Sequence, residues 1–232
     1  MPPPPDRAPA SAPALLLATA NPHKLAELRA IFATPALLLL SLDQLGPTPP
    51  EPAETGDTFE ANATIKALAY AAATGLCCLA DDSGLEVDAL GGAPGVISAH
   101  FATDGIPTGQ SRAQRDSANN AHLLARLAGT PPGARAARFV CVMALAVPRP
   151  AGPELLATFR SEMPGRIGVP PHVPRGEHGF GYDPLFLVGP DHARTSAQLP
   201  PQEKNRLSHR ARAAAMVARW LADNAHQLSA RA

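Results

Sequence analysis

The order of apolar and polar positions predicts alternating strands and helices. Continuous apolar runs are typical of strands covered on both faces, and apolar residues three and four apart are typical of helices. The predicted strands cover residues 14–20, 37–42, 76–80, 137–147 and 154–163. The predicted helices cover residues 23–32, 58–74, 111–127 and 203–227.

The last two strand-like runs are joined by the Pro-rich segment 148–153, which predicts an antiparallel hairpin. Together with the earlier strand–helix units, the hairpin indicates an α/β fold with a mixed sheet. The helix over 111–127 is expected to bury Ala118, Ala121, Leu124 and Leu127. Gly75 follows the helix over 58–74 at a position that suits a C-terminal cap.

Composition limits the class of protein. The chain has 232 residues, of which 45% are hydrophobic and 17% charged, as expected for one globular domain with a sizeable core. The formal net charge is zero, so we expect no polymeric nucleic acid and no acidic membrane as partner. No apolar run approaches the ~20 residues of a membrane span. The domain is expected over 14–228, after a disordered Pro/Ala-rich leader (1–13) and before a short tail (229–232).

The three cysteines, Cys77, Cys78 and Cys141, show no CxxC spacing. Adjacent cysteines do not form a useful disulfide, so all three are expected to be reduced thiols in the core. That usage is typical of a cytoplasmic protein.

Two adjacent carboxylates, Asp81 and Asp82, end the apolar run 76–80. Carboxylates are seldom buried unless they are paired or bind a metal. Successive side chains of a strand point to opposite faces, so both can face one ligand only if the chain turns. We expect Ser83-Gly84 to supply that turn. A solvated turn, with Asp as a local hydrogen-bonding residue, is the alternative.

A second candidate site lies where the first strand meets the first helix. Asn21 is a favourable N-cap, and Pro22 suits the first helical position. Free amides at a helix N-terminus attract anions, and Thr19 and Lys24 add a hydroxyl and a positive charge. An ordinary capped helix with a surface lysine is the alternative.

Three later segments add candidates. Asn62 and Lys66 share one face of the helix over 58–74, either toward a ligand or as a solvated stripe. Phe180 stands between two glycines, as a base-stacking ring or as a core residue. The C-terminal helix begins with basic residues, which serve either a ligand or a solvated face. These are Lys204, Arg206, His209, Arg210 and Arg212.

These segments carry a family resemblance. The run Asp-Asp-Ser-Gly-Leu-Glu-Val-Asp-Ala-Leu-Gly-Gly-Ala-Pro-Gly from Asp81 resembles the signature of the inosine triphosphate pyrophosphatase family. Four more segments follow the family's order, so the resemblance covers about residues 14–222. They are Thr-x-Asn-x-x-Lys from Thr19, Glu-Thr-Gly-x-Thr-Phe-x-x-Asn-Ala-x-x-Lys-Ala from Glu54, Gly-Phe-Gly-Tyr-Asp-Pro from Gly179, and Lys204 with Ser208-His209-Arg210.

The resemblance implies a long mixed sheet flanked by helices, in two lobes with a cleft between them. It implies hydrolysis of ITP, dITP and XTP to the monophosphate and pyrophosphate, which removes deaminated purines from the nucleotide pool. It also implies a homodimer and Mg²⁺ as cofactor. Carboxylates with no His/Cys cluster suit Mg²⁺.

The resemblance also implies roles for individual residues. Asp82 would be the catalytic base, and Glu54, Asp81 and Asp82 would hold the metal. Glu60 lies one position away from the acidic residue of some relatives, where this chain has Ala61, and receives no role. The residues implied in substrate binding are Thr19, Ala20, Asn21, Pro22, His23, Lys24, Asn62, Lys66, Ser83, Phe180, Gly181, Tyr182, Asp183, Lys204, His209 and Arg210.

Two other functions fit parts of this pattern. A nucleotide-sensing module would keep the Thr19–Lys24 turn but would lack a complete carboxylate set, which this chain has. A Maf-type pyrophosphatase of similar fold would act on pyrimidine or methylated nucleotides, and the segment Ser208-His209-Arg210 argues against it.

Overall fold

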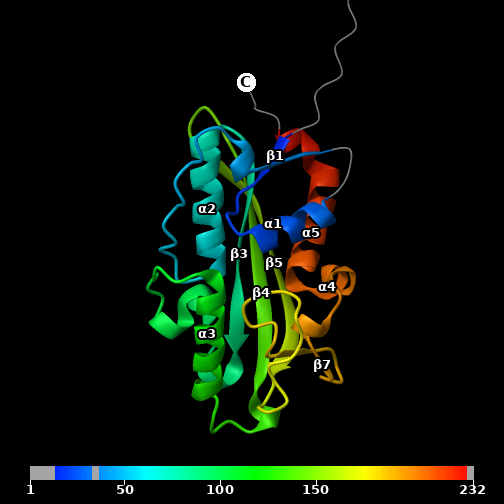
Figure 1. The fold of residues 1–232 in the computed structure, drawn as a ribbon. Coiled ribbons are helices and arrows are strands. Elements are labelled where there is room, and N and C mark those ends of the chain that lie inside the picture. Colours follow the sequence, from blue (N-terminus) through cyan, green and yellow to red (C-terminus); the bar gives the residue numbers. More distant parts are fainter. Residues whose placement is uncertain (1–13, 33–36, 229–232) are drawn as a thin grey trace, which may run out of the picture.

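The computed structural model describes residues 14–32 and 37–228, so the predicted leader and tail lie outside the described residues. The fold is a long sheet with helices on both faces (Figure 1). The strands are β1 (Ala14–Leu17), β2 (Leu38–Ser41), β3 (Cys77–Val87), β4 (Ala136–Val147), β5 (Glu154–Ile167), β6 (Phe186–Val188) and β7 (Arg194–Thr195). The α-helices are α1 (Pro22–Ile31), α2 (Phe59–Thr74), α3 (Arg112–Arg126), α4 (Pro201–Leu207) and α5 (His209–Asn224).

The sheet is mixed, as predicted. Its strand order is β2-β1-β3-β4-β5-β6-β7, with β1 parallel to both β2 and β3 and every later pair antiparallel. The hairpin of β4 and β5 is confirmed. No helix among the described residues is long and apolar enough to cross a membrane.

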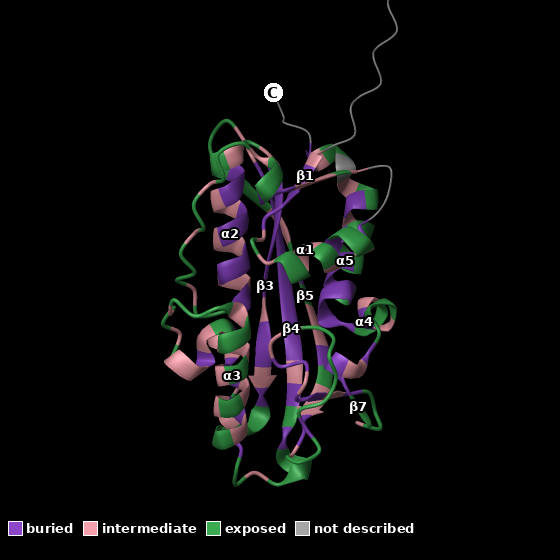
Figure 2. Cartoon of the chain, viewed as in Figure 1, coloured by how far each residue is buried: buried purple, intermediate pink, exposed green. Residues whose placement is uncertain are grey.

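Three apolar clusters hold the helices to the sheet. At one end of β4, Val142 and Ala144 pack with α2 on one face, while Met143 and Leu145 pack with α1 and α5 on the other. Toward the other end, Phe139 and its neighbours pack with α3 and β6. β4 is buried along most of its length (Figure 2). The predicted α/β class is therefore confirmed.

The predicted helix starts are confirmed by their capping bonds. The side chains of Asn21, Thr58 and Ser111 accept hydrogen bonds from backbone N–H groups at the starts of α1, α2 and α3. Gly75 ends α2 with a φ of 66°, a left-handed conformation that favours glycine. All three cysteines are free and buried, as predicted.

The prediction of one C-terminal helix is wrong, because the segment forms α4 and α5. Ser208 between them is extended, and its Oγ accepts a hydrogen bond from the amide of Ala211 at 3.1 Å. A side chain that caps a helix start competes with continuation of the preceding helix. The break places His209 and Arg210 in the first turn of α5.

The predicted buried stripe of α3 is partly wrong. Leu127 is buried as expected, but Ala121 is exposed, and the stripe runs through Asn119 and Leu123. Asn119 donates to the carbonyls of Ser98 and Ala99 and accepts from the amide of Ala102. These bonds satisfy a buried amide, so a polar residue occupies an inward position that the apolar pattern missed.

The expected turn at Ser83-Gly84 does not occur. β3 continues to Val87, because β4 pairs with it without interruption from Cys78 to Val87. Similarly, β5 continues past Met163 to Ile167. Pro164 is tolerated there because β6 pairs with β5 only from Gly165 onward.

Candidate active site

A cavity of about 830 Å³ opens beside the middle of β3. It receives residues from the β1–α1 turn, the loop before α2, α2, β3, α3, the loop 180–183, α4 and α5. Five separate parts of the chain that carry the predicted motifs therefore meet around one space.

The free edge of β3 explains how one cavity reaches both faces of the sheet. β1 pairs with β3 only from Cys77 to Leu79, and the amide of Ala18 makes a last bond to the carbonyl of Leu79 at 2.9 Å. From Ala80 to Leu85, β3 has a strand partner, β4, on one side only, before Glu86 forms a bridge with Pro94 on the other side. Asp81 and Asp82 point to opposite faces, yet both line the cavity across this edge.

Asp81 lies on the side of α1 and α5. Its Oδ2 is 2.9 Å from Lys24 Nζ and 3.6 Å from Arg210 Nε, and it accepts a hydrogen bond from Ser83 Oγ at 3.2 Å. Burial alone raises the pKa of this carboxyl, but Lys24, Arg210 and Lys66 outweigh it and hold the pKa well below its usual range. Asp81 is therefore a fixed negative charge that holds two cations.

Asp82 lies on the side of α2. Its Oδ1 is 3.2 Å from Lys66 Nζ, which also lies 3.0 Å from Glu54 Oε1. Burial raises the pKa of Asp82, and the nearby Glu54 and Asp81 raise it further, so Lys66 and Lys24 offset the shift only in part. A carboxylate with a raised pKa is a better proton acceptor than an ordinary aspartate.

The β1–α1 turn supplies a helix N-terminus, as predicted. Thr19, Ala20, Asn21 and Lys24 line the cavity. Thr19 Oγ1 accepts from the amide of Asn21 at 3.2 Å, and Asn21 Oδ1 accepts from the amide of His23 at 3.0 Å. Among the predicted site residues, Pro22 and His23 do not line the cavity.

Phe180 and its neighbours form the other end of the cavity. The ring of His23 stacks on Phe180 at 5.2 Å between centroids, and the cations of Lys204 and Arg210 lie 5.4 and 5.8 Å from the Phe180 centroid. Asp183 fixes this arrangement, because it accepts from Lys204 Nζ at 2.7 Å and from the amide of Phe180 at 2.8 Å. A partly buried aromatic face beside cations suits a flat, polar ring.

Gly181, Tyr182 and His209 also line this end of the cavity. The buried Tyr182 hydroxyl donates to the carbonyl of Ser98 at 2.8 Å, so this side chain anchors the loop. His209 stacks on Phe139, with ring centroids 5.1 Å apart. Burial and the nearby Arg210 and Lys204 hold the pKa of His209 well below its usual value, so its imidazole is neutral.

Four residues that bear on the site were not predicted; Glu27 supports it from outside the cavity lining, and the other three line the cavity. Glu27 in α1 forms an ion pair with Arg210 Nη1 and lies 3.6 Å from Lys204 Nζ. Asp116 Oδ2 accepts from the amide of Gly181 at 2.8 Å. Glu27 follows Lys24 by three residues in α1, a spacing that puts both on one helix face and could have indicated it. Arg112 and Arg115 also line the cavity, and the sequence of α3 gave no signal for them because its pattern is that of an ordinary surface helix.

The donor set fits a hard cation in part. No three His, Cys, Asp or Glu side chains gather as a ready metal cage in the described part of the chain. However, Asp81 Oδ1 and Asp82 Oδ2 are buried and have no hydrogen-bond partner. Mg²⁺ needs only one or two carboxylates when substrate oxygens and waters complete its shell. These two unpaired oxygens fit that requirement.

Cations and carboxylates balance in the cavity. The cationic residues are Lys24, Lys66, Arg112, Arg115, Lys204 and Arg210. The acidic residues are Glu51, Glu54, Asp81, Asp82, Asp116 and Asp183. The cavity therefore offers positive side chains to a polyanion, but its acidic and cationic residues are equal in number, so it has no large excess of positive charge.

Fold and cavity together define an α/β protein whose cleft combines a helix N-terminus, buried carboxylates, cations and an aromatic ring. Residues 15–220 match the model of the Ham1 family, and the chain belongs to that family.

Named relatives agree with the family match. A dITP/XTP pyrophosphatase of Anaeromyxobacter dehalogenans is 45% identical over 225 residues, covering 86% of this chain and 93% of the relative. One of Nocardia farcinica is 49% identical over 203 residues, covering 86% and 90%. Among solved structures, a HAM1 protein from Coxiella burnetii has a TM-score of 0.76 at 37% identity, covering 91% of this chain and 99% of that one.

Proposed function

We propose that this protein hydrolyses non-canonical purine nucleoside triphosphates, namely dITP, XTP and ITP, to the monophosphate and pyrophosphate. Five predicted motif segments line one cavity, and this observation carries the proposal. The relatives named as dITP/XTP pyrophosphatases support it.

The two ends of the cavity suit the two parts of such a substrate. The α1 N-terminus with Lys24 and Lys66 offers amides and positive charge to the triphosphate. Phe180, with Lys204 and Arg210 beside its ring, offers a stacking surface for the base. Asp81 and Asp82 lie on β3, which carries both carboxylates into the same cavity.

In the proposed reaction, Asp82 accepts a proton from a water molecule whose oxygen attacks the α-phosphorus. The bond from this phosphorus to the bridging oxygen breaks, and pyrophosphate leaves with the bonding electron pair. Lys66 and Lys24 offset the negative charge that develops.

We further propose that Asp81 and Asp82 hold Mg²⁺ through their unpaired oxygens, with Glu54 nearby. The cavity holds as many acidic as cationic residues, so its cations are already largely neutralised by ion pairs. A triphosphate adds several negative charges, and a divalent cation at the two unpaired carboxylate oxygens would offset them. When bound, the metal would supply Lewis-acid stabilisation of the phosphate oxygens.

Selection of the base follows from hydrogen-bond chemistry. Hypoxanthine and xanthine carry a 6-carbonyl, whereas adenine carries a 6-amino group. Arg210 and Lys204 carry donors only, and Arg210 Nε has no hydrogen-bond partner. Adenine would leave the Arg210 Nε donor unpaired, at a cost of ~1–3 kcal/mol. The homodimer implied by the family resemblance and the cytoplasmic location predicted from the cysteines stay predictions.

The test measures products from a panel of ITP, dITP, XTP, ATP, GTP and CTP with Mg²⁺ and with EDTA. We expect one pyrophosphate and one monophosphate per turnover, a preference for the 6-oxopurines that lack a 2-amino group, and loss of activity in EDTA. Release of orthophosphate, or full activity in EDTA, would contradict the mechanism. Binding without turnover would instead indicate a nucleotide sensor, and a preference for CTP would indicate the Maf-type activity.

A further inference from the structure

A second cavity of about 390 Å³ shares no lining residue with the candidate active site. It lies where β5 ends against β6. Its walls come from the segment before β4, the end of β5, the following loop, β6 and the β6–β7 connection. The lining residues are Pro132, Arg166, Ile167, Gly168, Val169, His172, Arg175, Leu187, Asp191 and His192.

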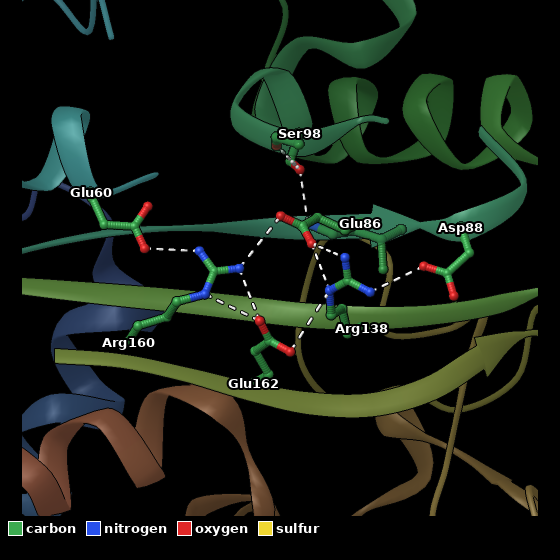
Figure 3. Close-up of polar contacts among 9 residues, drawn as sticks. Glu60, Glu86, Asp88, Ser98, Arg138, Arg160 and Glu162 are labelled. Carbon is green, nitrogen blue, oxygen red and sulfur yellow. Dashed lines mark hydrogen bonds and ion pairs between the residues drawn. The ribbon is translucent and has the colours of Figure 1, made fainter. Parts of the chain in front are cut away.

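Arg166 belongs to a row of charged residues on one face of the sheet. Residues 160, 162 and 166 are separated by even numbers along β5, so their side chains share a face. Arg160 lies 2.9 Å from Glu60 and 2.9 Å from Glu162. Figure 3 shows this network joining β3, β4, β5 and α2.

Arg138, on the adjacent strand β4, also has carboxylate partners for its guanidinium group. Its Nε donates to Glu86 at 2.6 Å, and its Nη1 donates to Asp88 at 3.0 Å (Figure 3). Within the described residues, Arg166 has no hydrogen-bond or ion-pair partner, although it is partly buried. A guanidinium group carries five donors, and those of Arg166 are left free for a ligand in the cavity.

Other groups in the cavity are unmatched as well. His192 Nδ1 is buried without a hydrogen-bond partner. Arg175 donates to the carbonyl of Ala193 at 3.0 Å, and no carboxylate of the described chain is within ion-pair distance of it. Asp191 is the one carboxylate in the lining, and its Oδ1 accepts from the amide of Ala193 at 3.3 Å. Two arginines and two histidines thus face one carboxylate.

We infer that this second cavity binds a small organic anion, with its phosphate or carboxylate group held by Arg166 and Arg175 and its body against apolar walls. A guanidinium group suits either oxyanion, because its forked donors match the oxygen geometry. Pro132, Ile167, Val169 and Leu187 form the apolar part of the lining. The volume lies near the lower end of typical ligand sites, roughly 300–1,000 Å³, so a compact ligand fits.

The test uses the imidazole C–H resonances of His172 and His192 as local NMR probes during titration with phenyl phosphate. His172→Gln and His192→Gln assign the signals. We expect a saturable shift of both resonances. The affinity for benzoate then shows whether a carboxylate group can replace the phosphate group. The affinity for inorganic phosphate, compared with that for phenyl phosphate, shows how much the apolar ring contributes. No part of this assay depends on turnover, so it can fail while the proposed function holds, and the reverse.

Arg166→Gln should weaken this binding about tenfold or more, since a hydrogen bond to a charged group is lost. Arg160→Gln is the matched control on the same strand face, and it should leave the affinity unchanged. Thermal melting of both variants checks that they are folded. A shift that never saturates, or equal weakening by both substitutions, would overturn the inference.

Discussion

Asp81 and Asp82 are neighbours in one strand, yet their surroundings shift the pKa values of the two carboxyl groups in opposite directions. Lys24 and Arg210 approach Asp81, and its pKa falls. Asp82 meets Lys66, which it shares with Glu54, and its pKa rises. Successive side chains of a strand point to opposite faces of the sheet, so the two carboxylates lie on different faces. Both line one cavity because that cavity extends around the free edge of β3. One carboxylate is thus suited to hold charge in place and the other to accept a proton.

The largest expected effect on stability comes from Asp81→Asn. It leaves Lys24 without its carboxylate and leaves Arg210 with the ion pair to Glu27 alone, and breaking a buried pair costs about 3–5 kcal/mol. Because the pKa of Asp81 is lowered on folding, its contribution is present at neutral pH and is lost as pH falls through the folded pKa. Chemical denaturation at neutral pH measures the change.

Asp82→Asn is the matched control for that measurement. The fold raises the pKa of Asp82, so its ionised form gains little from its surroundings, and a neutral amide should cost far less stability. Equal destabilisation by the two substitutions would contradict the division between the faces.

Turnover is expected to depend strongly on Asp82. Asp82→Asn should lower kcat by ~10²-fold or more while nucleotide still binds, because the proposed proton acceptor is lost and the shape is kept. Steady-state kinetics measure the loss of kcat, and equilibrium binding of ITP measures the affinity separately. Turnover close to that of the unaltered enzyme would show that another group is the base.

A smaller effect is expected at the base end of the cavity. Phe180→Ala should raise KM for ITP roughly tenfold, because stacking on an aromatic ring is worth about 1–3 kcal/mol per base. Pyrophosphate has no base, so its inhibition constant should not change. If pyrophosphate binding weakens equally, Phe180 supports the phosphate end or the loop as a whole.

The helix starts, the mixed sheet and most residues that line the cavity could be predicted from the sequence, because caps, apolar runs and motif spacing are local signals. Asn21 and Gly75 cap their helices as predicted. The continuation of β3 through Ser83-Gly84 could not be predicted, because pairing with β4 is a contact between distant segments.

The same limit explains the other differences. Ser208 divides the last helix through a capping bond, and apolar periodicity carries no sign of that bond. Glu27 reaches Arg210, which is remote in sequence, and Asp116 likewise reaches Gly181. Local patterns therefore identified the motif residues, whereas the supporting partners depend on tertiary contacts.

The most direct test of the division between the two faces is the pH dependence of kcat/KM, which reports groups of the free enzyme. Asp82 works as a base only when ionised, so a raised pKa places the acidic limb above the ordinary carboxyl value of 3.8. Comparing the pH profiles of the unaltered enzyme and of Asp82→Asn distinguishes the titration of Asp82 from that of the substrate's own phosphate groups. We predict that this limb is absent from the residual activity of Asp82→Asn. An acidic limb with the same midpoint in both proteins would contradict the account.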